Sequence, residues 1–259
     1  MKKTKRHEEM LAAITEKGSI SVSSLVLKMP TSEATIRRDL SELEKQNRII
    51  RTHGNISISE SISGRLHPSF IEKLNVKSSE KNSVAANAAS LINPGDTIFI
   101  SSGSTTHKLI SHIRDIPNLT VITNALNIAN SLLNIPYLEC ILIGGMLRKD
   151  EMSLIGYIAE KLVKELRADK IFISTEGINF EKGLTNSYLP ETLTDQAILK
   201  MSPKIIMMAD HDKFQNIKTS CWAPVSIINT LITDNGTSKE ILAPYRDQGI
   251  NVIVVTPDS

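Results

Sequence analysis

The chain has 259 residues, of which 41% are hydrophobic and 22% are charged, with 12 Gly, 10 Pro and 2 Cys. This composition is typical of a globular protein and excludes a disordered chain, a collagen and a disulfide scaffold. No apolar stretch approaches the roughly 18 residues that a membrane span needs, and no apolar segment follows the charged start of the chain. We therefore expect a cytoplasmic protein with no membrane partner.

Cysteine and histidine spacing gives no sign of a metal or redox site. Cys140 and Cys221 show neither a CxxC motif nor Cys/His ligand spacing, so we expect buried structural thiols. The six histidines are scattered over unrelated segments, which argues against a metal-dependent regulator. They are His7, His53, His67, His107, His112 and His211. We expect no metal and no cofactor.

Charge is distributed unevenly along the chain. Residues 1–54 hold 11 Lys and Arg against 7 Asp and Glu, whereas the remainder holds 19 basic and 21 acidic residues. A small basic unit at the N-terminus could therefore face a polyanion. Aromatic residues make up only 4% of the chain, which argues against a base-stacking surface for single strands and favours a duplex as the partner.

The first 58 residues predict a winged helix-turn-helix domain. The pattern indicates a helix over 5–17, a short helix capped by Ser21 and stopped by Pro30, and a third helix over 33–45 capped by Ser32. An alternating segment, 48–58, then turns at a Gly-Asn pair as a hairpin does. Helix, short helix, tight turn, helix and hairpin together are typical of this DNA-binding fold.

The third helix divides into two faces. Ile36, Leu40 and Leu43 form an inner stripe, so the basic pair Arg37-Arg38 in its first two turns faces outward or lies on the flank. Such side chains contact base edges and phosphates. Our DNA-contact candidates in this helix and the wing are Ser32, Ala34, Thr35, Arg37, Arg38, Ser41, Lys45, Arg51 and His53. A protein-docking module with a solvated basic pair is the alternative reading.

The remainder predicts a linker and a larger domain. Residues 59–69 are polar and contain Gly and Pro, so we place a linker there and a second domain over 70–259. Apolar runs alternate with helical stretches in this domain, which predicts an α/β fold with a mainly parallel sheet. Helices are expected over 79–92, 105–113, 125–133, 157–167 and 190–200, and strands over 97–100, 119–123, 138–143, 170–174, 204–209, 230–233 and 250–255.

Ligands of such sheets bind at the carboxyl ends of the strands, so the loops after the strands hold the candidate site. The loop from Ser101 to Thr106 combines a Gly turn, hydroxyl groups and a helix start, a pattern that binds phosphate. The alternative is that its hydroxyls only cap the helix. Our effector-binding candidates are Ser101, Ser102, Gly103, Ser104, Thr105, Thr106, Asn124, Gly144, Gly145, Glu176 and Lys213.

Two segments, Ser32–Leu40 and Arg51–Gly54, resemble the signature of the DeoR family of bacterial transcription regulators, and the resemblance extends over essentially the whole chain. It implies a C-terminal domain similar in fold to ribose phosphate isomerases that senses phosphorylated sugars or related metabolites. In these terms Ser102–Thr106 is the phosphate loop, Asn124 a ligand-side amide, and Lys213 a second phosphate contact.

The chain departs from the family pattern at several positions. Pro30 and Asn55 stand where the family usually has Gly, and both residues suit turns. In the expected pocket Ser101 and Glu176 each replace Asp, and Asp195, just past the matching Glu191, replaces Lys. These three changes predict an altered ligand or reduced affinity.

We therefore expect a DNA-binding repressor of a carbohydrate-metabolism operon that a phosphorylated sugar releases from its operator. Paired half-sites imply a homo-oligomer, either a dimer or a tetramer. The alternative from another class is a phosphosugar isomerase with an accessory basic domain. Glu176 could serve as its general base, yet no second acid or base is evident, so we expect no enzyme.

Overall fold

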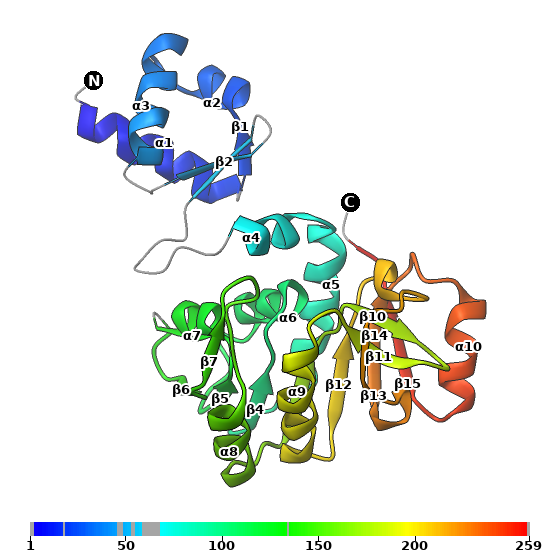
Figure 1. Cartoon of the computed structure of the whole chain (residues 1–259). Coiled ribbons are helices and arrows are strands. Elements are labelled where there is room, and N and C mark those ends of the chain that lie inside the picture. Colours follow the sequence, from blue (N-terminus) through cyan, green and yellow to red (C-terminus); the bar gives the residue numbers. More distant parts are fainter. Residues whose placement is uncertain are drawn as a thin grey trace. The chain divides into compact units, whose positions relative to one another are not determined.

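The computed structural model describes residues 3–17, 19–45, 49–52, 55–58, 68–133 and 135–257. The chain divides into two compact units, Met1–Arg65 and Leu66–Ser259 (Figure 1). None of the helices within the described ranges is long and apolar enough to cross a membrane.

The first unit has three helices and a small antiparallel sheet. Its elements are α1 (Lys3–Lys17), β1 (Ser19–Ser21), α2 (Val22–Lys28), α3 (Glu33–Lys45), β2 (Ile49–Thr52) and β3 (Asn55–Ile58). The strands pair in the order β1-β3-β2, which adds one strand to the predicted hairpin. The predicted inner stripe of α3, Ile36, Leu40 and Leu43, is fully buried in the core. The unit is the winged helix-turn-helix that the sequence predicts.

Local hydrogen bonds fix the ends of the second and third helices. The Ser21 hydroxyl accepts a 3.1 Å bond from the amide of Ser24, which is the expected cap of α2. The Ser32 hydroxyl accepts a 3.4 Å bond from the amide of Thr35 at the start of α3. The predicted caps therefore stand where α2 and α3 begin.

The second unit is built on a seven-stranded sheet in the order β15-β14-β12-β9-β4-β5-β6, and every neighbouring pair is parallel (Figure 1). These strands are β4 (Thr97–Ile100), β5 (Thr120–Thr123), β6 (Glu139–Leu142), β9 (Lys170–Ile173), β12 (Ile205–Met208), β14 (Thr230–Asp234) and β15 (Asn251–Val255). A hairpin, β7 (Met146–Arg148) with β8 (Ser153–Ile155), and a smaller antiparallel sheet, β10 (Gly177–Asn179), β11 (Gly183–Asn186) and β13 (Ser220–Ala223), complete the strands.

Helices cover both faces of the large sheet. They are α4 (Pro68–Asn75), α5 (Ser78–Ala89), α6 (Ser104–Lys108), α7 (Leu126–Leu132), α8 (Tyr157–Glu165), α9 (Thr192–Ile198) and α10 (Lys239–Asp247), with short 3-10 turns η1 (Leu109–His112), η2 (Leu189–Glu191), η3 (Leu199–Met201), η4 (His211–Lys213) and η5 (Val225–Ile227). One core packs α8, α9 and α10 with the smaller sheet, and the other packs α5, η1 and α7. This is the expected α/β fold.

Several predicted boundaries differ from the structure. The expected helix over 105–113 is α6 continued by η1, and the expected helix over 190–200 is η2, α9 and η3. Helix α4 begins at Pro68, inside the segment predicted as a linker, and the rest of that segment lies outside the described residues. The hairpin β7–β8, the smaller sheet and α10 were not predicted, because short strands and a helix that contains Pro give weak periodic signals.

The expectation of buried thiols is wrong. Cys140 and Cys221 are both free and exposed. Cys140 lies on β6, the edge strand of the large sheet, and all four residues of β6 are exposed. An apolar run predicts a strand buried on both faces only where helices cover both faces, and an edge strand can lack that cover.

Candidate functional site

The outward face of α3 presents the residues predicted to contact DNA. Ser32, Ala34, Arg37, Arg38 and Ser41 are exposed, and Thr35 is half-buried. The side chain of Lys45 and the whole of His53 lie outside the described residues. The helix therefore offers a row of hydroxyl, methyl and guanidinium groups opposite its buried stripe.

The three arginines of this surface differ in their partners. Arg37 pairs with Glu33 one turn earlier, Nη2 to Oε1 at 2.7 Å. Arg51 donates to the Arg37 carbonyl and to the Ser41 hydroxyl, each at 3.3 Å, and so ties the wing to α3. Within the described ranges Arg38 has no polar partner. Arg38 is thus the guanidinium of the surface that can reach a ligand without breaking a contact.

A buried ion pair joins α3 to α1. The Arg6 guanidinium donates to the Asp39 carboxylate, and His7 Nε2 lies 3.4 Å from the same carboxylate. The hydrogen bond from Arg6 lowers the pKa of Asp39 against the opposing effect of burial. Atoms of His7, Asp39 and Glu42 lie within 4.8 Å of one another, as metal ligands do. Because Arg6 already occupies Asp39, we propose no metal site there.

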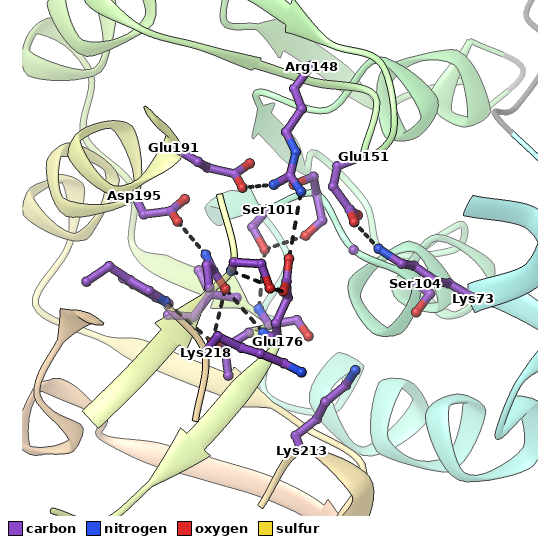
Figure 2. Close-up of a pocket in the computed structure, with 18 of the residues that line it drawn as sticks. Lys73, Ser101, Ser104, Arg148, Glu151, Glu176, Glu191, Asp195, Lys213 and Lys218 are labelled. Atoms are coloured by element: carbon purple, nitrogen blue, oxygen red, sulfur yellow. Dashed lines mark hydrogen bonds and ion pairs between the residues drawn. The ribbon is translucent and has the colours of Figure 1, made fainter. Parts of the chain in front are cut away.

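The second unit contains a cavity of about 610 Å³ at the carboxyl ends of β4, β5 and β9 (Figure 2). Seven of the eleven effector-binding candidates line it: Ser101, Ser102, Gly103, Ser104, Asn124, Glu176 and Lys213. They come from four separate strand ends, so the sheet brings together residues that lie more than one hundred positions apart. The volume is that of a small-molecule site.

The other four candidates do not line the cavity. Thr105 and Thr106 are buried, and the Thr106 hydroxyl donates to the carbonyls of Ser101 at 2.8 Å and Gly103 at 3.1 Å. The hydroxyl thus holds its own loop, and it does not cap α6, whose N-cap residue Gly103 makes no side-chain capping bond. Gly145 packs against the backbone of Ile155, where a Cβ would come within 2.8 Å of the carbonyl, and Gly144 lies beside it. Gly145 therefore serves close packing, whereas a Cβ on Gly144 would meet Leu162 Cδ1 at 3.9 Å, an ordinary contact.

The loop after β4 depends on one glycine and two hydroxyls. Gly103 has φ of 141°, a backbone conformation that glycine tolerates best. The Ser101 hydroxyl accepts a 3.3 Å bond from the Ser174 amide, which couples the loops after β4 and β9. The Thr123 hydroxyl donates to the Ile100 carbonyl at 2.7 Å and positions the loop after β5 in the same way. The cavity floor is therefore preorganised.

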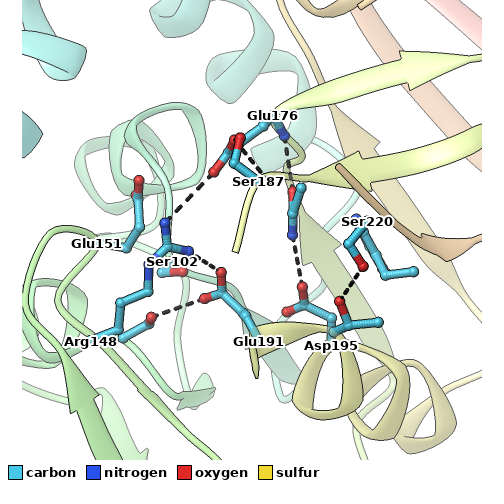
Figure 3. A network of polar contacts seen from close by, with 12 residues as sticks. Ser102, Arg148, Glu151, Glu176, Ser187, Glu191, Asp195 and Ser220 are labelled. Atoms are coloured by element: carbon cyan, nitrogen blue, oxygen red, sulfur yellow. Dashed lines mark hydrogen bonds and ion pairs between the residues drawn. The ribbon is translucent and has the colours of Figure 1, made fainter. Parts of the chain in front are cut away.

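A network around Arg148 forms one wall (Figure 3). Arg148, at the end of β7, pairs with Glu191, and its Nη2 lies 3.7 Å from Glu176 Oε1. Its guanidinium carbon also lies 4.6 Å from the centre of the Tyr188 ring. Glu191 accepts a further 3.0 Å bond from the Ser153 hydroxyl. Arg148 was not predicted, because the search covered strand ends and this residue comes from an unpredicted hairpin that lies over them.

Asp195 extends this network along α9. Its Oδ2 accepts a 2.9 Å bond from the Asn186 side chain. The Asn186 Oδ1 in turn accepts from the Glu176 amide at 3.2 Å. Trp222, on β13, lines the cavity nearby and donates from Nε1 to the Thr175 hydroxyl at 3.4 Å. The three pocket positions that are predicted to depart from the family pattern, Ser101, Glu176 and Asp195, therefore line one cavity.

The acidic groups of the wall have different titration behaviour. Burial opposes ionisation of Glu176, yet hydrogen bonds from Ser187 outweigh it and lower its pKa. Burial raises the pKa of Glu191 despite the Arg148 charge. Burial and the neighbouring Glu191 charge raise the pKa of Asp195 well above its ordinary value. The wall thus holds more carboxyl groups than its one guanidinium neutralises.

Lysines occupy other parts of the lining. Lys81 of α5 is buried and donates to the carbonyls of Lys73 at 2.6 Å and Val76 at 2.7 Å, at the end of α4. Burial lowers its pKa to about 8. Lys73 pairs with Glu151. The sequence does contain a signal that Lys81 is buried. At helical spacing it shares one face of α5 with Val84, Ala85 and Ala88, which are buried.

Comparison with known proteins agrees with this architecture of a DNA-binding unit and a sensor-like α/β unit. The model of a DeoR-like helix-turn-helix domain matches residues 6–61, and that of the DeoR C terminal sensor domain matches residues 76–235. The chain belongs to the DeoR family of transcriptional regulators.

Curated relatives match over nearly their whole length. The glycerol-3-phosphate regulon repressor of Escherichia coli K12 is 30% identical, with 97% of this chain and 99% of the relative covered. A putative aga operon transcriptional repressor of Escherichia coli O157:H7 is 29% identical, with 97% and 94% covered. These relatives are transcriptional repressors.

Solved structures resemble the chain only distantly. Ribose 5 phosphate isomerase A from Neisseria gonorrhoeae matches with a TM-score of 0.38 and 13% identity, over 52% of each chain. The beta subunit of eIF2B from Chaetomium thermophilum matches with a TM-score of 0.41 and 14% identity, over 95% of this chain and 69% of that one. We draw nothing about activity from these similarities.

Proposed function

We propose that this chain is a cytoplasmic repressor of a carbohydrate-metabolism operon, released from its operator when a phosphorylated sugar or related metabolite binds in the cavity. The observation that carries the proposal is the cavity itself. Seryl loop residues, Lys213 and Lys218 line it together, at the carboxyl ends of parallel strands. Hydroxyl, amide and ammonium groups are the partners that a small phosphate monoester requires.

The DNA contacts in this proposal come from α3 and the wing. Arg38 is exposed and has no polar partner in the described part of the chain, which supports a role in base or phosphate contact. Lys45 and His53 remain candidates on the sequence pattern alone. In the same proposal residues 1–58 form the DNA-binding domain, 59–69 the linker, and 70–259 the sensor domain.

The isomerase alternative is not favoured. A general base for enol chemistry needs a carboxylate with a pKa near the working pH. The pKa of Glu176 is lowered, since Ser187 donates to Oε2 from both its amide and its hydroxyl. A carboxylate held in this way is a weak base, so Glu176, the residue that the isomerase alternative requires, is poorly suited to that role.

Association of protomers is part of the proposal. Large apolar side chains are exposed on the β6 side of the second unit, on β6 itself, on β7 and on α8. They are Ile141, Leu142, Met146, Leu147, Tyr157, Ile158 and Leu162. Exposed apolar groups on neighbouring elements are typical of an interface. A second copy would also supply the second half-site contact for an operator.

The test of release uses full-length protein and a labelled duplex from upstream of its own gene. We expect fluorescence anisotropy to show salt-dependent, sequence-selective binding, and one phosphorylated sugar to weaken it at least tenfold. The same sugar without its phosphate is the control and should have no effect. Binding that no phosphorylated metabolite changes would contradict release.

The test of association is sedimentation velocity. Ile158→Glu on α8 places a charge among the exposed apolar groups and should shift the protein toward the monomer. Lys164→Glu on the same helix is the matched control, because Lys164 is exposed and polar. Equal sedimentation of Ile158→Glu and the unaltered protein would exclude this face.

A further inference from the structure

The cavity has two chemically different ends. Glu191 and Asp195 lie at one end, and Lys213 and Lys218 lie on the other side of Glu176 (Figure 2). No ion pair joins either of these lysines to a carboxylate within the described ranges. A ligand that matches both ends must therefore be anionic at one end and different in charge at the other.

The acidic end holds more carboxyl groups than the one guanidinium beside them can pair with. Arg148 is the guanidinium there, and it is shared between Glu191 and Glu176. Asp195 accepts from the neutral Asn186 amide, and no Lys or Arg pairs with it in the part of the chain that the structure describes. The raised pKa of Asp195 agrees with this geometry, because burial beside Glu191 disfavours its charge. A ligand cation would relieve that cost.

A second observation at the same cavity calls for a hydrogen-bond donor. Asn124 lines the cavity and is 2% exposed. Its Nδ2 donates to the Leu154 carbonyl at 3.2 Å, so the amide orientation is fixed. Its Oδ1 is buried without a partner. A buried acceptor left unsatisfied is costly, and because an amide oxygen can only accept, a hydrogen-bond donor is needed to satisfy it.

A metal ion is a poorer match for these groups. The cluster of ligand atoms close enough to hold an ion among the described residues is His7, Asp39 and Glu42, in the other unit. The cavity carboxylates do not converge in that way. An ammonium group needs no such convergence, because its three N–H donors point in different directions.

We propose that the ligand of this cavity is a phosphate monoester that carries a primary amine, such as an amino-sugar phosphate, with the phosphate toward Lys213 and Lys218 and the ammonium toward Glu191 and Asp195. This inference rests on the proposed sensing function and narrows its ligand class. A hydroxyl could donate to Asn124, yet only a cation also balances the surplus carboxyl charge.

The experiment measures binding to full-length protein by titration calorimetry with matched ligands. The probes are glucosamine 6-phosphate and galactosamine 6-phosphate, the parent hexose 6-phosphates, the N-acetylated hexosamine 6-phosphates, and glucosamine without phosphate. We expect an amine-bearing phosphate to bind at least tenfold more tightly than its parent and its N-acetylated form. Equal or weaker binding of the amine overturns this inference and leaves the sensing proposal intact. Binding by none of these phosphates also overturns this inference, whereas the sensing proposal stands or falls on the operator-release assay.

A variant pair assigns the preference to Asp195. Asp195→Asn keeps an oxygen that can accept from Asn186 and removes the charge, so it should abolish the tenfold preference while phosphate binding remains. Asp115→Asn is the matched control, since Asp115 is exposed and outside the lining, and it should keep the preference. An amine preference that survives Asp195→Asn overturns the assigned contact, and the unaltered protein tests the ligand class even if this variant does not fold.

Discussion

Each unit contains a largely buried arginine–carboxylate pair, and the two pairs differ in how fully the carboxylate charge is balanced. Arg6 with Asp39 and Arg148 with Glu191 are alike in exposure, since both guanidinium side chains are 13% exposed. The pKa of Asp39 is lowered, whereas that of Glu191 is raised. The first carboxylate has a guanidinium of its own and His7 beside it, whereas the second shares its guanidinium with Glu176. The first pair joins two helices of one unit, whereas the second leaves a carboxyl group that, under the proposed sensing function, can contact a ligand.

The largest effect is expected from breaking the first of these pairs. Asp39→Ala removes a carboxylate that is 3% exposed and that Arg6 and His7 both face, so protection of the amides of α1 and α3 should fall by about 1.5–3 kcal/mol. Hydrogen exchange on the full chain measures this locally. Glu33→Ala, which breaks an exposed pair with Arg37, is the control and should cost less than about 1 kcal/mol. If Asp39→Ala and Glu33→Ala lowered amide protection by similar amounts, burial would not distinguish the two ion pairs.

Arg38 is exposed and has no carboxylate partner among the residues that the structure describes, so its substitution should affect DNA binding and not folding. Arg38→Ala should weaken specific operator binding by about 1–3 kcal/mol and leave the melting temperature unchanged. Anisotropy titration against the operator measures the first, and calorimetry the second. Arg246→Ala, in the second unit, is the control. Unchanged operator affinity in Arg38→Ala would mean that α3 presents another face to the duplex.

Asp39 and Asp195 should contribute to stability with opposite dependence on pH. Asp39 has a lowered pKa, so its stabilisation is present above the ordinary carboxyl pKa and is lost as pH falls through the lowered value. Asp195 has a raised pKa beside Glu191, so its relative stabilisation is present below the ordinary value and is lost as pH rises through the raised one. Each unit of pKa rise corresponds to about 1.4 kcal/mol.

Hydrogen exchange is measured at pH values from about 4 to about 8, the range over which carboxyl groups with shifted pKa values titrate. Amide protection around α9 should fall as the pH rises. Asp195→Asn should flatten the dependence around α9, with Glu191 and Glu176 left as the titrating neighbours. An equal pH dependence around α9 in Asp195→Asn and in the unaltered protein would contradict the raised pKa of Asp195.

The smallest effect is expected from the exposed pair of α3. A double-mutant cycle on Glu33 and Arg37 should give a coupling of about 0.3–0.5 kcal/mol, because solvent screens both groups. Urea unfolding of the four proteins measures it. A coupling as large as that of a buried pair would show that exposure does not separate the pairs in this protein.

The N-terminal unit could be predicted well from the sequence because its signals are local. Ser21 and Ser32 cap helices within four residues of their partners, and the stripe of α3 recurs at helical spacing. The role of Asp39 could not be predicted, since its partner Arg6 lies 33 residues away. Helical periodicity places a carboxylate on a face and does not identify what it meets there.

The cavity could be predicted only where strands end. Ser101–Ser104, Asn124, Glu176 and Lys213 follow predicted strands, and all of them line the cavity. Arg148 comes from a hairpin that folds over the strand ends, and Lys81 comes from a helix beside them, so neither followed from the strand-end rule. Thr106 lies in the predicted loop, yet its hydroxyl donates a hydrogen bond to the Ser101 carbonyl and does not line the cavity. The rule that ligands bind at strand ends therefore predicts the residues that directly follow the strands, and it misses residues that other elements contribute to the cavity.

The one tryptophan of the chain, Trp222, lies in the cavity lining with its indole N–H bonded to Thr175. Indole emission of the unlabelled protein therefore originates entirely from the second unit, at the wall where a ligand would dock. The first unit is silent at those wavelengths, so a change in emission colour or intensity on adding DNA would report a signal that has travelled from one unit to the other. Trp222 fluorescence can therefore test, without any label, whether DNA binding to the first unit changes the surroundings of the cavity.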